Sequence, residues 1–512
     1  MEDNKREFDE NLKLIFKTSI FILFATVLSK VFTYLYRIII ARDFGPETYG
    51  LFSLALMVLG WFVSFFSFGF YEGILRFIPF YRGKKRKDNV KYVFKFSFIV
   101  LLISSIFSTI ILYLFADFIS INIFHNVSLI IFLKILALSL PFFSLAYLFL
   151  AVIQAHEKIK VHSFISDILF NFINLVSLLV LIFVGLKIHS VIFSYFIGLI
   201  GIFLISFIFC RKRISEIFEK NKLKRNAKKK IRRELFSYSW PLIFLGLLTG
   251  LLPNIDSFVI GYVKGASDVG IYNAALLISG FMIFVPTLFI RLFFPLITRE
   301  FSKQKFDVIK ELSKQIQKWI FIVNLPLLVL MVIFPGVFIN LLFGAQYLGA
   351  ENALRFLAIA FFFSSLSMIF SSLISMVGKS KLILLNTIIF SVSNLVLNLI
   401  LVPKYGISGA AFATMISNAV LTFIFFFQVK KYTSIVPFRR KMIPILLSII
   451  PSTLLLVYIK NLFPINLITI LLEGSMFVLL YILFIFITKS LDRNDFMILK
   501  SIKQNILSIK SR

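Results

Sequence analysis

Apolar runs of about 20 residues, the length that crosses the hydrocarbon of a bilayer as an α-helix, divide nearly the whole chain. Short polar segments separate these runs. The runs lack the polar–apolar alternation that is typical of strands in an outer-membrane barrel. The pattern therefore predicts an all-α polytopic membrane protein. We expect about 14 transmembrane helices, at residues 14–40, 49–79, 92–115, 129–154, 162–184, 189–210, 236–262, 271–296, 319–343, 352–376, 382–402, 409–429, 442–459 and 467–488.

Two stretches of the chain, 220 positions apart, repeat one pattern of small residues. They are FGPETYGLFSLALMVLG at 44–60 and KGASDVGIYNAALLISG at 264–280, in which Gly45, Gly50, Ala55 and Gly60 fall on Gly265, Gly270, Ala275 and Gly280. The match continues farther along the chain, where Ala137 matches Ala358 and Gly185 matches Gly406. Duplicated bundles that face each other across a central cavity are typical of secondary transporters.

The repeat groups the expected helices into two sets of six, with two left over. We expect an N-terminal six-helix lobe at 1–210, a basic cytoplasmic linker at 211–235, a C-terminal six-helix lobe at 236–430, and two extra helices with a basic cytoplasmic tail at 431–512. Two interpretations of the linker stay open. It is either a solvated segment that fixes the topology or an interfacial helix on anionic lipid headgroups.

The net charge of +31 suggests a nucleic-acid partner only until the basic residues are mapped onto the expected spans. If the N-terminus is inside, 42 of the 55 Lys and Arg residues lie in internal segments, and 5 lie in external loops. This bias is the positive-inside rule of membrane proteins. We therefore expect no nucleic-acid partner, a multi-pass protein of the plasma membrane, and cytoplasmic N- and C-termini.

The composition and the short motifs exclude further classes of protein. The chain is 59% hydrophobic, and its apolar runs exclude a soluble multidomain protein. Its single cysteine, Cys210, excludes disulfides and cysteine-based metal sites, and its four histidines are dispersed, so no metal site is expected. Gly378-Lys379-Ser380 resembles the end of a phosphate-binding loop, but Leu373 occupies the position of the leading glycine. We expect no enzyme, no catalytic residue and no cofactor.

Ionisable side chains inside membrane-spanning helices are costly unless they face a cavity or a partner, so they are functional candidates. Thr26, Lys30, Thr33 and Arg37 stand at i, i+4, i+7 and i+11 of the first helix and lie along one stripe. In the seventh helix, Asp256 falls beside the counterpart of Arg37. These residues form a cationic site with an acidic counter-group in a shared cavity, or Asp256 forms a structural ion pair with Arg37 or Lys30, or each arrangement holds in a different state of one cycle.

A second group of charges lies near the expected inner surface. Glu72 and Arg76 are spaced i, i+4 with the acid first, the favourable order for an ion pair within one helix. Arg291 is close to the counterpart of Arg76 when Pro79 is aligned with Pro295. Basic residues at both positions would suit a cytoplasmic entrance for an anion, although snorkelling to the inner interface also explains them.

Polar residues of the fifth helix complete the candidates. Asp167, Asn171 and Asn174 line up at i, i+4 and i+7, where interhelical hydrogen bonding competes with binding of sugar hydroxyls. We expect the central substrate-binding cavity to contain Lys30, Arg37, Arg76, Asp256 and Arg291. A second set of cavity candidates comprises Thr26, Thr33, Glu72, Asp167, Asn171, Asn174 and Arg355.

The run ARDFGPETYGLFSLALMVLG, together with GFYEGILRFIPFYRGKKRK, resembles the N-terminal signature of the polysaccharide biosynthesis (oligosaccharide, O-antigen-type) flippases. Their superfamily also holds the multidrug and toxin extrusion (MATE) transporters and the lipid II flippases. The resemblance implies a MATE-like fold with two six-helix lobes in a V, and alternating access. It also implies export of a polyprenyl-diphosphate-linked oligosaccharide to the outer leaflet for surface glycan assembly, with Lys30, Arg37 and Arg76 holding the diphosphate.

The expected partners are the lipid-linked oligosaccharide, membrane lipids and glycan-assembly enzymes. Moving about two negative charges outward against an inside-negative potential near 100 mV gains about 4–5 kcal/mol, so the membrane potential or an ion gradient would drive transport. The alternative is a multidrug–cation antiporter of the MATE type, whose cavity should be acidic, whereas basic groups outnumber acids in these helices. A membrane glycosyltransferase would need a large loop with clustered acidic residues, which the chain lacks.

Overall fold

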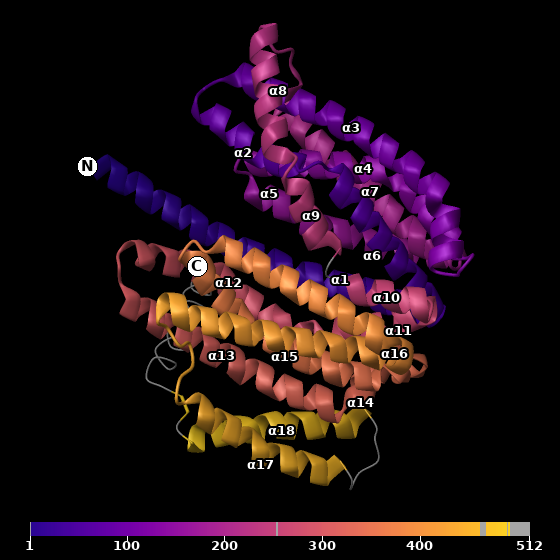
Figure 1. Ribbon diagram of the computed structural model, residues 1–512, viewed down its shortest axis with the longest axis vertical. Helices are drawn as coiled ribbons and strands as arrows, with labels where there is room; N and C mark the ends of the chain where they lie inside the picture. Colours follow the sequence, from indigo (N-terminus) through magenta and orange to yellow (C-terminus); the bar gives the residue numbers. More distant parts are fainter. Residues whose placement is uncertain (1, 252–253, 461–466, 489, 492–512) are drawn as a thin grey trace. The chain divides into compact units, whose positions relative to one another are not determined.

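The computed structural model describes residues 2–251, 254–460, 467–488 and 490–491 (Figure 1). Nearly all of these residues are helical and none of them forms a β-strand, so the predicted all-α fold is confirmed. The chain folds as two compact units. Unit 1 comprises Met1–Ala274 and Val402–Ile407, and unit 2 comprises Ala275–Leu401 and Ser408–Arg512. The six-helix lobes predicted from the repeat stay a prediction, and most of the expected basic tail lies outside the described residues.

Unit 1 is built from long apolar helices and short connecting turns. Its elements are α1 (Glu2–Phe66), α2 (Phe70–Gly83), α3 (Lys87–Phe118), η1 (Ile119–Ile123), α4 (Leu129–Ala155), α5 (Ile159–Ser163), η2 (Phe164–Leu169), α6 (Phe170–Phe183), α7 (His189–Arg213), η3 (Ser215–Phe218), α8 (Arg225–Ser239), α9 (Leu242–Leu251), α10 (Ile255–Val263) and the first part of α11 (Ala266–Ser279).

The long helix α1 bends at Gly45, which has φ 79° and ψ 178°. This positive φ suits glycine, because glycine has no Cβ to clash with the backbone. Pro46 follows directly and lacks the N–H that would continue the hydrogen-bond ladder. The Gly-Pro pair therefore folds the chain back within one continuous helical stretch, between two of the expected spans.

Two glycines of the repeated motif meet in unit 1. A Cβ on Gly50 would lie 1.7 Å from the Ala266 carbonyl oxygen, and a Cβ on Gly270 would lie 2.0 Å from the Pro46 carbonyl oxygen. The backbones of α1 and α11 thus approach each other more closely than any side chain allows, as small residues permit in membrane helices. The repeat places a glycine on each side of one helix crossing.

The core of unit 1 is rich in aromatic rings from α3, α4 and α7. The Phe149 ring lies 5.5 to 6.3 Å, centroid to centroid, from the rings of Phe94, Phe203, Phe207 and Phe218. Tilted and edge-on pairs at these separations are favourable beyond their contact area. They fix how these helices pack where lipid offers no hydrophobic driving force.

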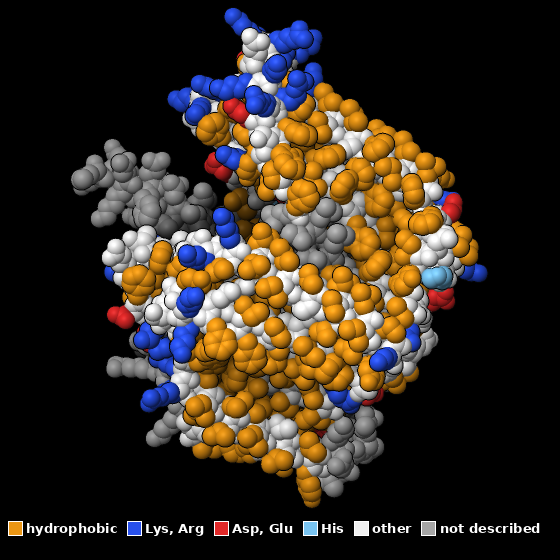
Figure 2. Space-filling model, viewed as in Figure 1, with side chains coloured by type: hydrophobic (Ala, Val, Ile, Leu, Met, Phe, Trp, Pro, Cys, Tyr) orange, Lys and Arg blue, Asp and Glu red, His pale blue; other side chains and the backbone are white. Residues whose placement is uncertain are grey.

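The second half of the expected linker is helical and packed. It forms α8, which buries Ile231, Leu235 and Ser239 against unit 1. Gly73 of α2 makes room for this contact, because a Cβ there would lie 2.8 Å from the Leu235 side chain. Lys and Arg side chains gather over α8 at the top of the view in Figure 2. The linker therefore combines an anchored apolar face with an exposed basic face, and its helix extends past the expected boundary to Ser239.

Unit 2 is also built from long helices joined by short turns. Its elements are the end of α11, α12 (Phe281–Ser302), α13 (Phe306–Ile333), α14 (Pro335–Phe343), η5 (Ala345–Ala350), α15 (Glu351–Met376), α16 (Ser380–Thr433), α17 (Met442–Lys460) and α18 (Leu467–Ile487). Helix α16 bends at Gly406, with φ 57°, within its Val402–Ile407 segment, which belongs to unit 1. The hairpin of α17 and α18 packs on α13, where the Tyr481 hydroxyl donates to the Ile322 carbonyl over 3.2 Å.

Ten helices in the described part of the chain are long and apolar enough to cross a membrane. Two of them, Phe21–Phe66 and Ser380–Thr433, pass through two expected spans each. Each of the fourteen expected spans overlaps helix, although several are broken by short turns, as between α13 and α14. The chain is a multi-pass membrane protein, and the count of fourteen stays a prediction.

Candidate functional site

The polar stripe of α1 faces α6 within unit 1. The Thr33 hydroxyl lies 2.8 Å from the Ser29 carbonyl oxygen and 3.0 Å from Asn171 Oδ1. The Asn171 amide donates to Ser29 Oγ over 3.1 Å and to the Asp167 carbonyl over 2.7 Å. Asn171 therefore makes the interhelical hydrogen bonds predicted for this polar group, with Thr33 and Ser29 of α1 as its partners, whereas its bond to Asp167 is local.

A single π-helical turn, η2, positions these groups. It carries Asp167, which accepts from the Ser166 hydroxyl over 3.1 Å, and Asn171 follows in α6. Such turns are rare and occur often at functional sites, because they redirect side chains that a regular helix would place elsewhere. The turn packs against α1. Apolar periodicity could not predict it, since it changes the hydrogen-bond pattern and not the hydropathy.

Arg37 lies among tyrosines. Its guanidinium is within reach of the Tyr49 hydroxyl and close enough to those of Tyr34, Tyr36 and Tyr195 to act on them electrostatically. The bend at Gly45 returns the chain so that Tyr49 reaches Arg37, twelve residues earlier. Sequence reasoning missed Tyr49 and Tyr195, because Tyr49 lies beyond the bend of α1 and Tyr195 belongs to α7.

Helix α1 is held in place from α7. The Tyr36 hydroxyl donates to the Val191 carbonyl over 3.1 Å and lies 3.0 Å from Ser194 Oγ. Tyr36 is buried, whereas Arg37 beside it is half-buried and Lys30 is exposed. The anchored residue therefore fixes the rotation of α1, and Lys30 and Arg37 share a stripe about 100–120° around the helix from it.

Neither Lys30 nor Arg37 forms an ion pair with a described side chain. Asp256 is 9% exposed and accepts a hydrogen bond from the Tyr272 hydroxyl, which reaches it from α11. This structure does not show the ion pair of Asp256 with Arg37 or Lys30, which stays a prediction for other states.

Arg76 contacts aromatic rings in this structure. Its guanidinium carbon lies 4.2 Å from the centroid of the Tyr238 ring of α8 and 5.5 Å from that of Phe77. Glu72 and Arg76 are both exposed and do not form the expected ion pair with each other. A cation over an aromatic face gains about 0.5–1 kcal/mol at an exposed site, and this contact takes the place of the intrahelical pair.

The remaining candidates make local contacts. Thr26 donates to the Ile22 carbonyl over 2.7 Å, and buried Asn174 packs against Gly198, where a Cβ would lie 1.7 Å from Asn174 Oδ1. In unit 2, Arg355 binds the Val332 carbonyl, Asn352 and Glu351, which gives it a structural role. Arg291 is exposed on α12.

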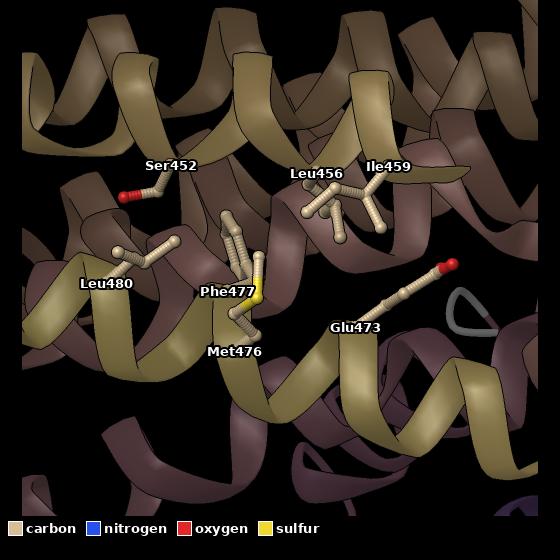
Figure 3. A pocket seen from close by; sticks show the side chains of 7 residues that line it. All are labelled: Ser452, Leu456, Ile459, Glu473, Met476, Phe477 and Leu480. Carbon is tan, nitrogen blue, oxygen red and sulfur yellow. The ribbon is translucent and has the colours of Figure 1, made fainter. Parts of the chain in front are cut away.

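A crevice between α17 and α18 in unit 2 is too narrow for a water-sized molecule (Figure 3). Ser452 and Glu473 lie at its two ends, with Leu456, Met476 and Phe477 between them. Glu473 is 8% exposed. The crevice is an imperfection of helix packing and gives no room for a substrate.

Residues 15–299 match the model of the family described as "Polysaccharide biosynthesis protein", which covers more than half of the chain. The chain belongs to this polysaccharide biosynthesis family. Residues 241–400 also match the MatE family. The resemblance predicted from the α1–α2 signature is thereby confirmed.

Relatives of this polysaccharide biosynthesis family member match it over most of the length of both chains. The chain is 25% identical over 386 residues to the "Putative O-antigen transporter" of Shigella flexneri, covering 73% of this chain and 87% of that protein. A solved structure of the lipid II flippase MurJ in an inward closed conformation matches with a TM-score of 0.68 at 18% identity, over 91% of this chain and 98% of that one. An inward-facing MATE multidrug transporter matches with a TM-score of 0.69 at 15% identity, over 81% and 98%. The MATE-like fold is confirmed.

Proposed function

We propose that this protein translocates a polyprenyl-diphosphate-linked oligosaccharide from the cytoplasmic to the outer leaflet of the plasma membrane by alternating access. One observation carries the proposal. Lys30 and Arg37 lie on one stripe of a membrane-spanning helix without an acidic partner among the described side chains. A cation in this position is costly unless it meets an anion, water or a polar cavity.

The groups around the two cations match the two parts of such a substrate. Arginine binds phosphate oxygens through two parallel N–H···O bonds, and lysine adds a compact point charge. Tyrosine hydroxyls beside Arg37, and the Ser29, Thr33 and Asn171 cluster, offer donors and acceptors of the kind that sugar hydroxyls need. The diphosphate would therefore sit on Lys30 and Arg37, with polar groups available to the saccharide.

The names of the relatives support the same substrate class. One is described as an O-antigen transporter and another as a lipid II flippase. The inward bias of positive charge supports cytoplasmic termini. The names of the relatives also support a plasma-membrane location and export toward the outer leaflet. Enzymes that assemble the glycan on either side of the membrane are the expected partners.

Multidrug–cation antiport is the alternative, supported by the MatE match and the MATE structure. The electrostatics of unit 1 disfavour it, because Lys30 and Arg37 would repel a cationic drug. Asp256, the acid that such a drug would need, is buried and bonded to Tyr272.

The test is transport of a fluorescent polyprenyl-diphosphate oligosaccharide in proteoliposomes. The double variant K30Q/R37Q should lower the rate at least ~10-fold, since each charged hydrogen bond to phosphate is worth about 1.5–3 kcal/mol. Lys95→Gln, which removes an exposed cation of α3, is the matched control and should leave the rate unchanged. Equal rates for the double variant and wild type would refute the site, and cation-dye exchange driven by an ion gradient would favour the antiporter.

A further inference from the structure

A strongly basic pocket opens in unit 2, away from the residues assigned above. It has a volume of about 540 Å³, within the roughly 300–1,000 Å³ range of small-molecule sites. Most of its lining residues are cations, namely Lys310, Lys314, Arg439, Arg440 and Lys441, and none is acidic. They come from the first turns of α13 and from the 434–441 segment that joins α16 to α17.

The pocket is built by hydrogen bonds between these two segments. Lys310 and Lys314 stand at i and i+4 on one side of α13. Arg439 donates to Gln315 Oε1, which belongs to a residue only 7% exposed, and to Glu311 Oε2 over 3.3 Å. These bonds fix the connecting segment against α13.

Glu311, which lies beside the pocket, neutralises only part of the positive charge of the pocket's Lys and Arg side chains. Glu311 pairs with Lys314 and with Arg439, each over 3.3 Å. Lys310 and Arg440 are exposed and form no ion pair with a described side chain. The pocket therefore holds several like charges whose mutual repulsion a bound anion would relieve.

The surroundings indicate an amphiphilic anion. Val436 and Phe438 line the pocket beside the cations, and Phe438 is 39% exposed. The apolar helix α17 begins at Met442, directly after Lys441, and the apolar part of α13 follows its basic first turns. Both basic segments are among those that the charge bias predicts to be cytoplasmic. Basic pockets of this kind, on the cytoplasmic side between membrane helices, bind anionic headgroups.

We propose that this pocket binds the phosphate group of an anionic membrane lipid, with the acyl chains leaving along Val436 and Phe438. The lipid is a regulatory or structural ligand of unit 2 and not the transported molecule. A free phosphate or pyrophosphate ion has the same phosphate chemistry, but it has no apolar group that could contact Val436 and Phe438.

The experiment compares lipid binding by purified full-length protein in nanodiscs of neutral lipid that contain a titrated fraction of phosphatidylglycerol. Native mass spectrometry counts the lipids that stay bound. The variant K310Q/R440Q should weaken retention by roughly 10- to 30-fold, because each basic residue near a charged headgroup contributes about a factor of five. The variant K305Q/K381Q removes two exposed cations of unit 2 outside the pocket and should stay within about 2-fold of wild type.

Three outcomes would overturn the proposal. Equal losses in K310Q/R440Q and K305Q/K381Q would reveal only a general charge effect. No retained phosphatidylglycerol in the wild type would remove the site. Millimolar inorganic phosphate or pyrophosphate that binds in a manner dependent on Lys310 and Arg440, without lipid retention, would assign the pocket to a soluble anion. Because the readout is binding and not transport, these outcomes are independent of the function proposed for unit 1.

Discussion

His156 illustrates how a single buried group shapes the inner end of unit 1. Its Nδ1 lies 2.8 Å from the Val152 carbonyl oxygen, and its Nε2 lies 4.0 Å from Glu216 Oε1. Burial is the main cause that lowers the pKa of His156, and Arg82 and Lys158 lower it further. The Val152 carbonyl and Glu216 act in the opposite direction. The neutral ring is therefore the stable form in the folded protein.

This burial predicts an acid sensitivity. As pH falls below about 6.5, the ordinary pKa of histidine, the unfolded chain takes up a proton that the folded protein resists, so stability decreases. Between pH 7.5 and 5.5, the melting temperature of the purified wild type should fall more than that of His156→Gln, which cannot titrate. Parallel curves for the two proteins would contradict this role for His156.

At the residue scale, the sequence predicted the cations and the polar stripe of α1 but not their surroundings. Helical spacing places Lys30, Thr33 and Arg37 on one face, because it depends only on the chain itself. The Tyr195 and Tyr238 contacts depend on how other helices pack, which spacing within one helix does not specify. For the same reason the spacing suggested Glu72 as an ion-pair partner of Arg76 and could not suggest the aromatic ring of α8.

At the scale of helices, the crossing of α1 and α11 depends on the absence of side chains at Gly50 and Gly270. Gly50→Ala places a methyl group where the Ala266 carbonyl lies, so the two helices must separate. Overpacking of this kind typically costs about 1–3 kcal/mol. Thermal unfolding in detergent should show a clearly lower midpoint for this variant.

Gly60, at the end of the same motif, provides a matched control for the Gly50→Ala substitution. A Cβ at Gly60 would meet nothing within 4 Å, so Gly60→Ala should be neutral or slightly stabilising through its higher helix propensity. If both variants melt alike, the close approach of the two helices does not limit stability.

Helix positions were predictable and helix interruptions were not. Apolar length located helical segments along the chain, because a spanning helix must satisfy its backbone inside the segment. The bends at Gly45 and Gly406 lie within stretches that remain helical on both sides, and the π-turn η2 lies inside an expected span. Hydropathy averages over such local changes of hydrogen bonding. The glycine repeat was visible in the sequence, but its meaning as a crossing required the structure.

At the scale of the whole molecule, the asymmetry of Lys and Arg predicts the orientation in the membrane. Cys210 is buried, so single cysteines introduced at exposed positions can report on each side. A membrane-impermeant maleimide should label Lys187→Cys in intact cells and Lys85→Cys only after permeabilisation, because both positions are exposed and lie in loops of opposite predicted sidedness. The reverse pattern would invert the topology and, with it, the direction of transport.

Under the function proposed above, the positive charges of Lys30 and Arg37 determine which half of the transport cycle depends on the membrane potential. A carrier loaded with a diphosphate at Lys30 and Arg37 is close to electrically neutral at this site. Its outward movement therefore carries almost no net charge across the membrane potential. The emptied carrier returns with bare positive charge, and each elementary charge that crosses an inside-negative potential gains about 2.3 kcal/mol per 100 mV. The resetting stroke, not the loaded one, would then be the electrogenic step.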